Sequence, residues 1–441
     1  MRNPWYMAII LCFANAVAFI DRTSLPLIVQ PIELDLHLSD TQMSVLIGFA
    51  FILAYSGGGA FAGVLVDRFP RRWVLGLGIS LWSAATIYCG FAGAFAWMFA
   101  GRLGIGAGES VCGPAAMSLI RDAFTPDRRG RAIAIWALGA GIGGGAALLA
   151  GGAILHAIGN VSSVELPVIG AIRSWQFVLI CSGLMAIPVA LLSFTFPEPT
   201  RLASLAERSA INIGHAFAFL FENKIIFIPL FIVNGATIIL LTGFGVWMPA
   251  ILGRVWHVGR PEIGLTVGVL TIVLQPTSQF VAGLMMDRLG RSKNIARVFA
   301  IGALVSALVF VPTTGAPIAS SLNWTWALLA IEMLVGTSLF TIGTAAVAQL
   351  SPTAMVGKVT AIHFAWVGIV GTAVGPTLVA TLSDRLFSGP SALGQSLSLV
   401  SGFMCLVALV GFAFLAMRAR RARAGSPSLG TMVGDVDLET P

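Results

Sequence analysis

Apolar runs of about 20 residues alternate with short polar segments along most of the chain. A helix of that length crosses the hydrocarbon core of a bilayer, where only helices and closed barrels satisfy their own backbone hydrogen bonds. The pattern therefore predicts an all-α membrane protein with twelve transmembrane helices. The predicted spans lie near residues 5–30, 43–66, 73–95, 97–119, 132–157, 174–196, 225–252, 263–285, 296–313, 325–349, 358–382 and 395–417.

Charged residues indicate how these helices are oriented. If the spans alternate in direction, most of the 26 lysine and arginine residues lie on the side of the membrane that holds both termini. Cytoplasmic loops carry such an excess, so both termini are predicted to be cytoplasmic. The net charge of +7 is then mainly a topology signal and gives no reason to expect nucleic-acid binding. Four arginines fall on the opposite side, namely Arg173, Arg254, Arg260 and Arg385.

Composition supports the same class. Hydrophobic residues make up 57% of the chain and charged residues 10%, whereas soluble domains have about 25% charged residues. The five cysteines fall in apolar runs and lack metal-ligand spacing. The sequence has no phosphate-binding loop of the G-x-x-x-x-G-K-[ST] type and no visible nucleophile–base motif. We therefore expect no metal, no cofactor and no enzymatic activity, with a proton gradient as the driving force.

Four charged residues lie inside predicted spans of the first half. Arg102 and Glu109 lie in span four, about 10 Å apart along one helix face, and Asp21 and Arg22 lie in the outer half of span one. Spans one and four cross the bilayer in opposite directions, so all four residues reach similar depth and are predicted to meet. Charges at membrane depth are costly and are therefore functional candidates. We call these four residues the charge centre.

Within the charge centre, Asp21 and Glu109 are the expected proton carriers. Burial disfavours an ionised carboxylate and a nearby arginine favours it, so separating an acid from its arginine can load or release a proton. Arg102, rather than Arg22, is expected to bind an anionic substrate group, because an arginine fork holds a carboxylate or phosphate with two bonds. The alternative is a static ion network that only holds spans one and four together.

The second half offers fewer charged candidates. Glu332 is the only acid within a predicted span there, and it is either a substrate contact, a second coupling site or part of a packed ion pair. His363 is a candidate because histidine titrates near neutral pH, although a lone histidine in a helix is more often structural. Asn234, Gln275 and Thr341 are polar residues that either line a binding cavity or bond to neighbouring backbone groups.

An internal repeat divides the chain. A short loop after span two recurs after span eight at an offset of 220 residues, half the length of the chain. Two related halves are typical of transporters, with the substrate site between them near the bilayer midplane. The repeated positions are Gly63, Asp67, Arg68 and Arg71 in the first copy and Gly283, Asp287, Arg288 and Arg291 in the second.

The repeat predicts two pseudo-symmetric six-helix bundles, residues 1–196 and 225–418. Residues 197–224 form a predicted cytoplasmic linker, in which apolar residues at helical spacing between positions 213 and 221 predict an amphipathic helix. Residues 419–441 are expected to form a disordered cytoplasmic tail.

The two G-x-x-x-D-R-x-x-R loops resemble the signature of the major facilitator superfamily. That resemblance implies the superfamily's fold, alternating access and a loop that latches the cytoplasmic gate. By position, Asp67 would face a helix N-terminus of the other half, and Arg68 would pair with Asp122 at the end of span four. The sequence departs from the signature at Pro70, where the family usually has Gly, and at Ser292, which replaces a second Arg. The alternative is that these charges only cap helices and fix topology.

A narrower resemblance covers roughly residues 15–160. The segments Phe19–Arg22, Leu38–Gln42, Arg102–Ser110 and Asp122–Phe124 look like bacterial members of the Spinster branch, which includes animal exporters of sphingosine phosphate and lysophospholipids. The Asp-Arg pair with R-x-x-x-G-x-x-E is also similar to organic anion:cation symporters that carry sugar acids. The shared charge centre therefore indicates a mechanism better than a substrate.

Together these features predict a proton-coupled secondary transporter of an anionic or amphipathic organic substrate, with a lysophospholipid-like lipid as the first candidate. A proton symporter of small organic anions such as sugar acids is the alternative, and a ligand sensor without transport is a third. The expected setting is the bacterial inner membrane. The expected partners are the lipid bilayer, protons and the substrate, without nucleic acid, and the protein is expected to be monomeric.

Overall fold

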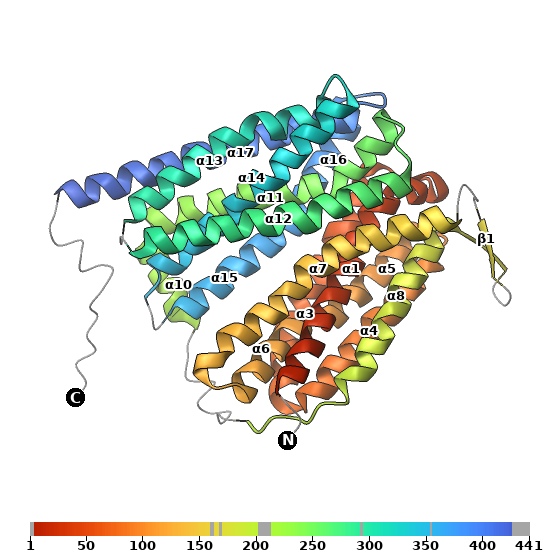
Figure 1. The fold of residues 1–441 in the computed structure, drawn as a ribbon, viewed down its shortest axis with the longest axis horizontal. Coiled ribbons are helices and arrows are strands. Elements are labelled where there is room, and N and C mark those ends of the chain that lie inside the picture. Colours follow the sequence, from red (N-terminus) through yellow and green to blue (C-terminus); the bar gives the residue numbers. More distant parts are fainter. Residues whose placement is uncertain are drawn as a thin grey trace. The chain divides into compact units, whose positions relative to one another are not determined.

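A computed structural model describes residues 4–158, 163–166, 170–201, 213–291, 294–352 and 355–425. In this part of the chain, twelve helical segments are long and apolar enough to cross a membrane (Figure 1). The predicted all-α membrane fold with twelve spans is therefore confirmed. Each span also begins within a few residues of its predicted start, because a change of hydropathy is a local property of the sequence.

The first six spans contain two interruptions that the sequence does not predict. Span two includes a π-helical turn, η1, and span four is broken at Ser110 and Val111. The elements are α1 (Pro4–Leu36), α2 (Asp40–Ser44), η1 (Val45–Phe49), α3 (Ala50–Arg68), α4 (Arg71–Gly90), α5 (Phe95–Glu109), α6 (Cys112–Ala123), α7 (Pro126–Ile158) and α8 (Ser174–Ser193).

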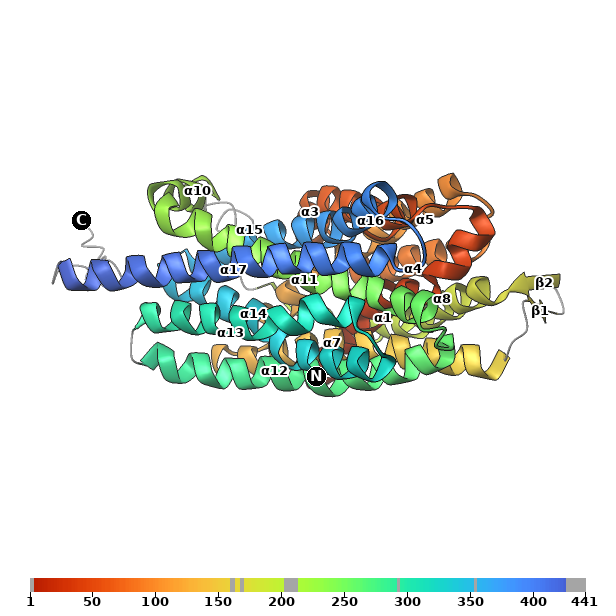
Figure 2. The same ribbon diagram turned by 90° about the horizontal axis from the view of Figure 1, so that it is seen from above.

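A short hairpin was also not predicted. Strands β1 (Ser163–Leu166) and β2 (Gly170–Arg173) pair antiparallel, with Ser163 opposite Arg173. Figure 2 shows the hairpin projecting beyond the end of α8. It lies in the segment between spans five and six.

The last six spans lie where they were predicted, but span eleven contains a π-helical turn, η3, that was not predicted. The helix α10 confirms the helix predicted in the linker. The helix α17 continues to Gly425. Residues 419–425 are therefore helical, whereas they were predicted to be disordered. Alanine and arginine dominate this stretch, and both are strong helix formers. The rest of the tail lies outside the described residues. The elements are α10 (Ile213–Glu222), α11 (Lys224–Val255), α12 (Arg260–Arg291), α13 (Ile295–Gly315), η2 (Ala316–Ile318), α14 (Leu322–Leu350), α15 (Val356–Ile369), η3 (Val370–Val374), α16 (Gly375–Leu386) and α17 (Ala392–Gly425).

Contacts group the chain into two compact units, and their boundaries differ from those of the two predicted bundles. The helices α11, α12 and α17 each pass from one unit into the other. The bundles 1–196 and 225–418 therefore stay a prediction. Unit 1 comprises Met1–Ala210, Gly245–Val273 and Thr372–Ser396, and unit 2 comprises Ile211–Phe244, Leu274–Gly371 and Leu397–Pro441.

The glycine-rich face of α7 allows two close helix contacts within unit 1. Against α1, a Cβ atom added at Gly143 would lie 2.1 Å from the carbonyl oxygen of Ala16. Against α12, a Cβ atom added at Gly152 would lie 2.9 Å from the carbonyl oxygen of Pro261. Only glycine leaves room for such approaches, as in many membrane helix pairs.

Candidate functional site

The structure brings the four residues of the charge centre together inside unit 1, as predicted. Asp21 and Arg22 come from α1, and Arg102 and Glu109 from α5. Asp21, Arg102 and Glu109 are between 1% and 3% exposed, whereas 30% of the Arg22 side chain is exposed. Two acids and two bases cancel in charge, which makes their common burial tolerable.

The four residues form two ion pairs that link α1 and α5. Arg22 donates from Nε to Glu109 Oε2 at 2.7 Å, and its Nη2 lies 2.5 Å from the same oxygen. Asp21 Oδ2 lies 3.6 Å from Arg102 Nη1, beyond hydrogen-bond distance. The other oxygen of Asp21 accepts a hydrogen bond of 2.7 Å from the hydroxyl of Thr86 on α4. The charge centre therefore contains one tight pair and one loose pair.

Arg102 is held by the backbone of η1. Its Nε and Nη2 donate to the carbonyl oxygens of Leu46 and Ile47, both at 3.0 Å. A π-helical turn disturbs the regular backbone hydrogen bonds of its helix, and such turns are frequent at functional sites. The side chain of Arg102 is thus buried and held by backbone groups at two of its nitrogens, while Nη1 has no hydrogen bond within the described chain. Its predicted role in binding a substrate anion stays a prediction, and Arg22, whose side chain is partly exposed, is a second candidate.

Aromatic rings surround Arg22, the partly exposed arginine of the charge centre. The guanidinium carbon of Arg22 lies 4.6 Å from the ring centroid of Phe51, 5.1 Å from that of Tyr55 and 5.2 Å from that of Phe19. The guanidinium carbon of Arg102 lies 5.3 Å from the same Phe51 ring. Ring faces attract these cations within about 6 Å. Arg22 therefore presents a positive charge in an apolar, aromatic setting.

Several buried polar atoms of the charge centre lack a hydrogen bond within the described part of the chain. They are Asp21 Oδ2, Glu109 Oε1 and Arg102 Nη1. A buried polar atom without a partner costs free energy, so the site favours a proton, a water molecule or a ligand group that would complete these bonds.

In unit 2, the predicted residues Asn234 and His363 are fully buried and lie on neighbouring elements. The His363 ring packs against Phe231 and Phe364, each with centroids 5.6 Å away. A Cβ atom added at Gly343 would lie 1.7 Å from Asn234 Oδ1. The amide atoms of Asn234 and both ring nitrogens of His363 have no hydrogen-bond partner among the described residues.

The other candidates of unit 2 are Glu332, Gln275 and Thr341. Glu332 on α14 is 3% exposed, and its Oε1 has no hydrogen bond within the described chain. It packs near Val309 of α13, because a Cβ atom added at Gly336 would lie 2.9 Å from Glu332 Oε1 and 3.3 Å from Val309. Gln275 on α12 and Thr341 on α14 are half-buried. Their predicted roles stay predictions.

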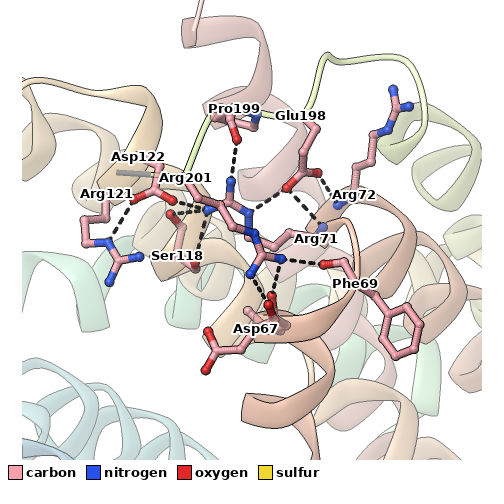
Figure 3. Close-up of polar contacts among 11 residues, drawn as sticks. Asp67, Phe69, Arg71, Arg72, Ser118, Arg121, Asp122, Glu198, Pro199 and Arg201 are labelled. Carbon is pink, nitrogen blue, oxygen red and sulfur yellow. Dashed lines mark hydrogen bonds and ion pairs between the residues drawn. The ribbon is translucent and has the colours of Figure 1, made fainter. Parts of the chain in front are cut away.

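The first signature loop surrounds a buried arginine, Arg71, at the start of α4 (Figure 3). Its Nη1 pairs with Asp122 and also donates to the carbonyl oxygen of Ser118 at 3.1 Å. Its Nε donates to Glu198 at 2.7 Å, and its Nη2 donates to the carbonyl oxygen of Pro199 at 2.6 Å. All three guanidinium nitrogens are therefore bonded. We call this group the Arg71 cluster.

The prediction that Arg68 pairs with Asp122 is wrong in this structure. Arg68 ends α3 and is exposed, whereas Arg71 begins the next helix and points towards α6. The turn at Phe69 and Pro70 separates the two arginines, and a helix pattern alone does not show which of them turns inwards. Asp67 is half-buried, and its expected place at a helix N-terminus stays a prediction.

Glu198 and Arg201, which follow α8 in the chain, also contact the first signature loop, and neither contact was predicted. The carboxylate of Glu198 accepts from the backbone nitrogens of Arg71 and Arg72, both at 3.1 Å, and so caps the N-terminus of α4. Arg201 donates to the carbonyl oxygens of Val66 at 3.0 Å and Phe69 at 2.8 Å. The start of the linker is thereby tied to the loop. In the sequence, the one feature that could have indicated this contact is a glutamate between two prolines, Pro197 and Pro199.

For the second copy of the signature loop, the structure describes only part of the side chains. Gly283 lies within α12, and no heavy atom lies within 4 Å of a Cβ atom added there, as at Gly63. Arg288 is exposed. The side chains of Asp287 and Arg291 lie outside the described residues, so their predicted latch role stays a prediction.

A second ion cluster, also absent from the predictions, lies where α1 ends. It comprises Glu33 of α1, Asp40 of α2 and Arg254 of α11, all within unit 1. We call it the Arg254 cluster. In the sequence, the one feature that could have indicated this cluster is an acid, Glu33, near the end of the first apolar run. As for metals, the described residues contain no group of three or more His, Cys, Asp or Glu side chains that could hold an ion.

Known proteins place this fold in context. The family model for the Major Facilitator Superfamily matches residues 11–251. An MFS-type efflux pump of Mycolicibacterium smegmatis is 24% identical over 426 residues, which are 95% of this chain and 94% of that protein. Protein spinster homolog 1 of Xenopus tropicalis is 26% identical over 468 residues, covering 98% of this chain and 85% of that protein.

Solved structures show the same fold. A bacterial homolog of the human lysosomal transporter Spinster, in an inward-facing and unoccupied conformation, superposes with a TM-score of 0.82 at 23% identity. The match covers 96% of this chain and 99% of that one. The resemblance to the Spinster branch therefore extends beyond the region where the sequence motifs lie. Since the family model matches more than half of the chain, the protein belongs to the Major Facilitator Superfamily and is a secondary transporter rather than an enzyme.

Proposed function

We propose that this protein is a proton-coupled transporter of an anionic, amphipathic organic substrate, with lysophospholipid-like lipids as the substrate class. One observation carries the proposal: two buried acids are each paired with an arginine inside one helix bundle. Ionisable pairs at membrane depth are typical of proton relays and substrate sites in transporters. The proposal needs no cofactor, and it treats the protein as a monomer of the bacterial inner membrane driven by the proton gradient.

The coupling follows from the tight pair. A substrate anion that binds the exposed side of Arg22 competes with Glu109 for the same guanidinium. The Glu109 side chain is fully buried, so it is favoured in its neutral form once the arginine is drawn away. Binding of the anion and binding of a proton to Glu109 therefore favour each other. Asp21, which is only loosely paired with Arg102, is the second proposed proton carrier.

The surroundings of Arg22 support the substrate class. Its guanidinium lies among the rings of Phe19, Phe51 and Tyr55, so an anionic headgroup bound there would lie next to apolar surface. A phosphate attached to an acyl chain has that combination of chemistry. The Spinster relatives agree with a lipid-like substrate by resemblance. A small carboxylate such as a sugar acid is the second candidate, because the same guanidinium fork binds carboxylates.

Ligand-induced thermal stabilisation of the purified protein tests the proposal. The ligands are a lysophospholipid series, sphingoid phosphates and sugar acids, each measured at two pH values. We expect lysophospholipids to stabilise the wild type more strongly at the lower pH. Glu109→Gln should bind at both pH values without that dependence, and Arg22→Ala should lose binding.

The matched control is Arg68→Ala, which removes an exposed arginine of the same unit. Stabilisation by sugar acids alone would replace the lipid with the second candidate. Binding that ignores pH in the wild type and survives Arg22→Ala would overturn the role of the charge centre. Proton-driven uptake into liposomes then separates transport from ligand sensing.

A further inference from the structure

The Arg254 cluster joins segments that lie more than 200 residues apart in the chain. Arg254 Nη2 lies 2.5 Å from Glu33 Oε2 and 2.7 Å from Asp40 Oδ1, and Nη1 lies 3.1 Å from Asp40 Oδ2. The hydroxyl of Ser383 on α16 donates to Asp40 at 3.2 Å. The backbone nitrogen of Thr41 donates to Asp384 at 2.9 Å. The cluster therefore holds α1 and α2 against α11 and α16.

The charges of this cluster do not balance. One guanidinium serves two carboxyl groups, whose side chains are 8% and 10% exposed. Glu33 Oε2 and Asp40 Oδ1 both bond to the same nitrogen, Arg254 Nη2, so the two carboxyl groups lie side by side, and Glu33 Oε1 is buried without a hydrogen bond to any described residue. Two neighbouring carboxylates repel each other when both are ionised, whereas one proton on the pair removes that repulsion.

Other charged groups at this end are engaged elsewhere or lie outside the cluster. Asp35 pairs with Arg173 and accepts a hydrogen bond from Trp175, so neither charge of that pair neutralises the cluster. Within the described residues, Arg254 is the one cation that forms an ion pair with Glu33 or Asp40. The remaining titratable or charged groups on the adjoining described segments form no ion pair with either acid; they are His37, His257, Arg260, Glu262, Asp384 and Arg385.

We propose that Glu33 and Asp40 share one proton beside Arg254, and that this proton keeps this end of unit 1 closed. Loss of the proton leaves two neighbouring negative charges beside one guanidinium and weakens the attachment of α11 and α16 to α1 and α2. The inference rests on secondary transport by alternating access, in which one end must open and close. It does not rest on proton coupling at the charge centre.

This proton site is separate from the one proposed at the charge centre. Asp21 and Glu33 lie on the same helix, twelve residues or about 18 Å apart. Within the same unit, α7 and α12 pack closely through Gly152 and Gly264, whose added Cβ atoms would lie within 3 Å of the opposite backbone. If this end faces outwards, as the predicted topology has it, protonation from outside would favour closure there.

The test uses the full-length protein in nanodiscs, with spin labels on Leu34→Cys of α1 and Leu386→Cys of α16. Both positions are exposed, at 68% and 67%, and the five native cysteines are replaced by alanine. Pulsed electron–electron double resonance then gives the distribution of distances between the two spin labels at pH values from 5 to 8.5. We expect a short distance at low pH and a growing longer population at high pH. For one proton, the closed-to-open ratio falls by up to about tenfold per pH unit.

Variants assign the response to the pair. Glu33→Gln and Asp40→Asn each leave one acid beside Arg254, so both should keep the short distance at every pH. Asp384→Asn is the matched control, because it removes an acid at the same end that bonds to Thr41 and not to Arg254. It should keep the wild-type pH response. Size-exclusion profiles identify any variant that fails to fold, and the second variant then decides.

The proposal would be overturned if the spin-label distance in the wild type did not change with pH. It would also be overturned if Glu33→Gln and Asp40→Asn both kept the wild-type pH response. The readout needs neither substrate nor transport. A negative result therefore leaves the proposed function standing, and a failure of pH-dependent ligand binding at Glu109 leaves this proposal standing.

Discussion

The Arg71 cluster and the Arg254 cluster are both built around one arginine, but they differ in how fully that arginine is satisfied. Tyr6 near the start of α1 bonds to Thr195 beside the first cluster, and Glu33 near its end belongs to the second. The two clusters thus lie about 40 Å apart along α1. Arg71 is completely buried, is bonded at all three nitrogens and pairs with two acids, of which Asp122 also pairs with a second cation, Arg121. Arg254 also pairs with two acids, but among the described residues it is the one cation in an ion pair with either of them.

The segments that each cluster joins differ in the same way. The Arg71 cluster ties α4 to α6 and to residues 198–201, all from the first predicted bundle. The Arg254 cluster ties α1 and α2 to α11 and α16, which belong to different predicted bundles. A saturated network suits a fixed part of the scaffold, and an unbalanced one suits a contact that must open. The predictions below test that contrast.

The largest effect is expected for Arg71→Met. It removes the buried cation of Asp122 and leaves that carboxylate with the more exposed Arg121 alone, and breaking a buried ion pair typically costs about 3–5 kcal/mol. Arg68→Met removes an exposed arginine of the same loop and should change stability little. The free energy of unfolding in mixed micelles measures both. A small loss in Arg71→Met would show that this cluster is as adaptable as the other.

Gly152→Val attacks the Arg254 end without changing any charge. Its side chain would meet Pro261 and Leu265 of α12, and overpacking of this kind costs about 1–3 kcal/mol. We expect the spin-label distance across α1 and α16 to lengthen even at low pH. Gly141→Val is the control on the same helix, because no atom lies within 4 Å of its added Cβ. Equal distances in the two variants would contradict close packing as a condition of closure.

Glu198→Gln probes the capping part of the Arg71 cluster. Glutamine has one terminal oxygen, so it can still accept one of the two backbone hydrogen bonds of α4, but it loses the other bond and the charge that faces Arg71 and the helix N-terminus. The expected loss of unfolding free energy is about 1 kcal/mol. Glu222→Gln, at an exposed position of α10, is the comparison variant. A loss as large as that of Arg71→Met would show that charge, rather than geometry, dominates this cluster.

The smallest effect is expected for Arg254→Lys. Lysine keeps the positive charge but lacks the planar fork that reaches Glu33 and Asp40 together. The closed-to-open ratio at low pH should fall about two- to threefold, which corresponds to roughly 0.5 kcal/mol. Arg385→Lys on the exposed part of α16 should leave the ratio unchanged. A collapse of closure in Arg254→Lys would mean that arginine, and not the shared proton, holds this end.

The charge centre shows where prediction from residues works. Asp21, Arg22, Arg102 and Glu109 were predicted to meet, because charges in membrane spans avoid lipid and helical geometry fixes their depth. Which acid pairs with which arginine was not predictable. That choice depends on the π-helical turn η1, whose carbonyl groups bind Arg102, whereas the partly exposed Arg22 pairs with Glu109.

The sequence by itself determined the membrane class, the spans and the charge centre, because hydropathy and helical periodicity act over short stretches of chain. Tertiary structure alone decided that Arg71 rather than Arg68 turns towards Asp122, since a turn of two residues sets that direction. It also decided that Glu33 and Asp40 meet Arg254, more than 200 residues away. Such contacts depend on how separate helices pack, and no local pattern encodes them.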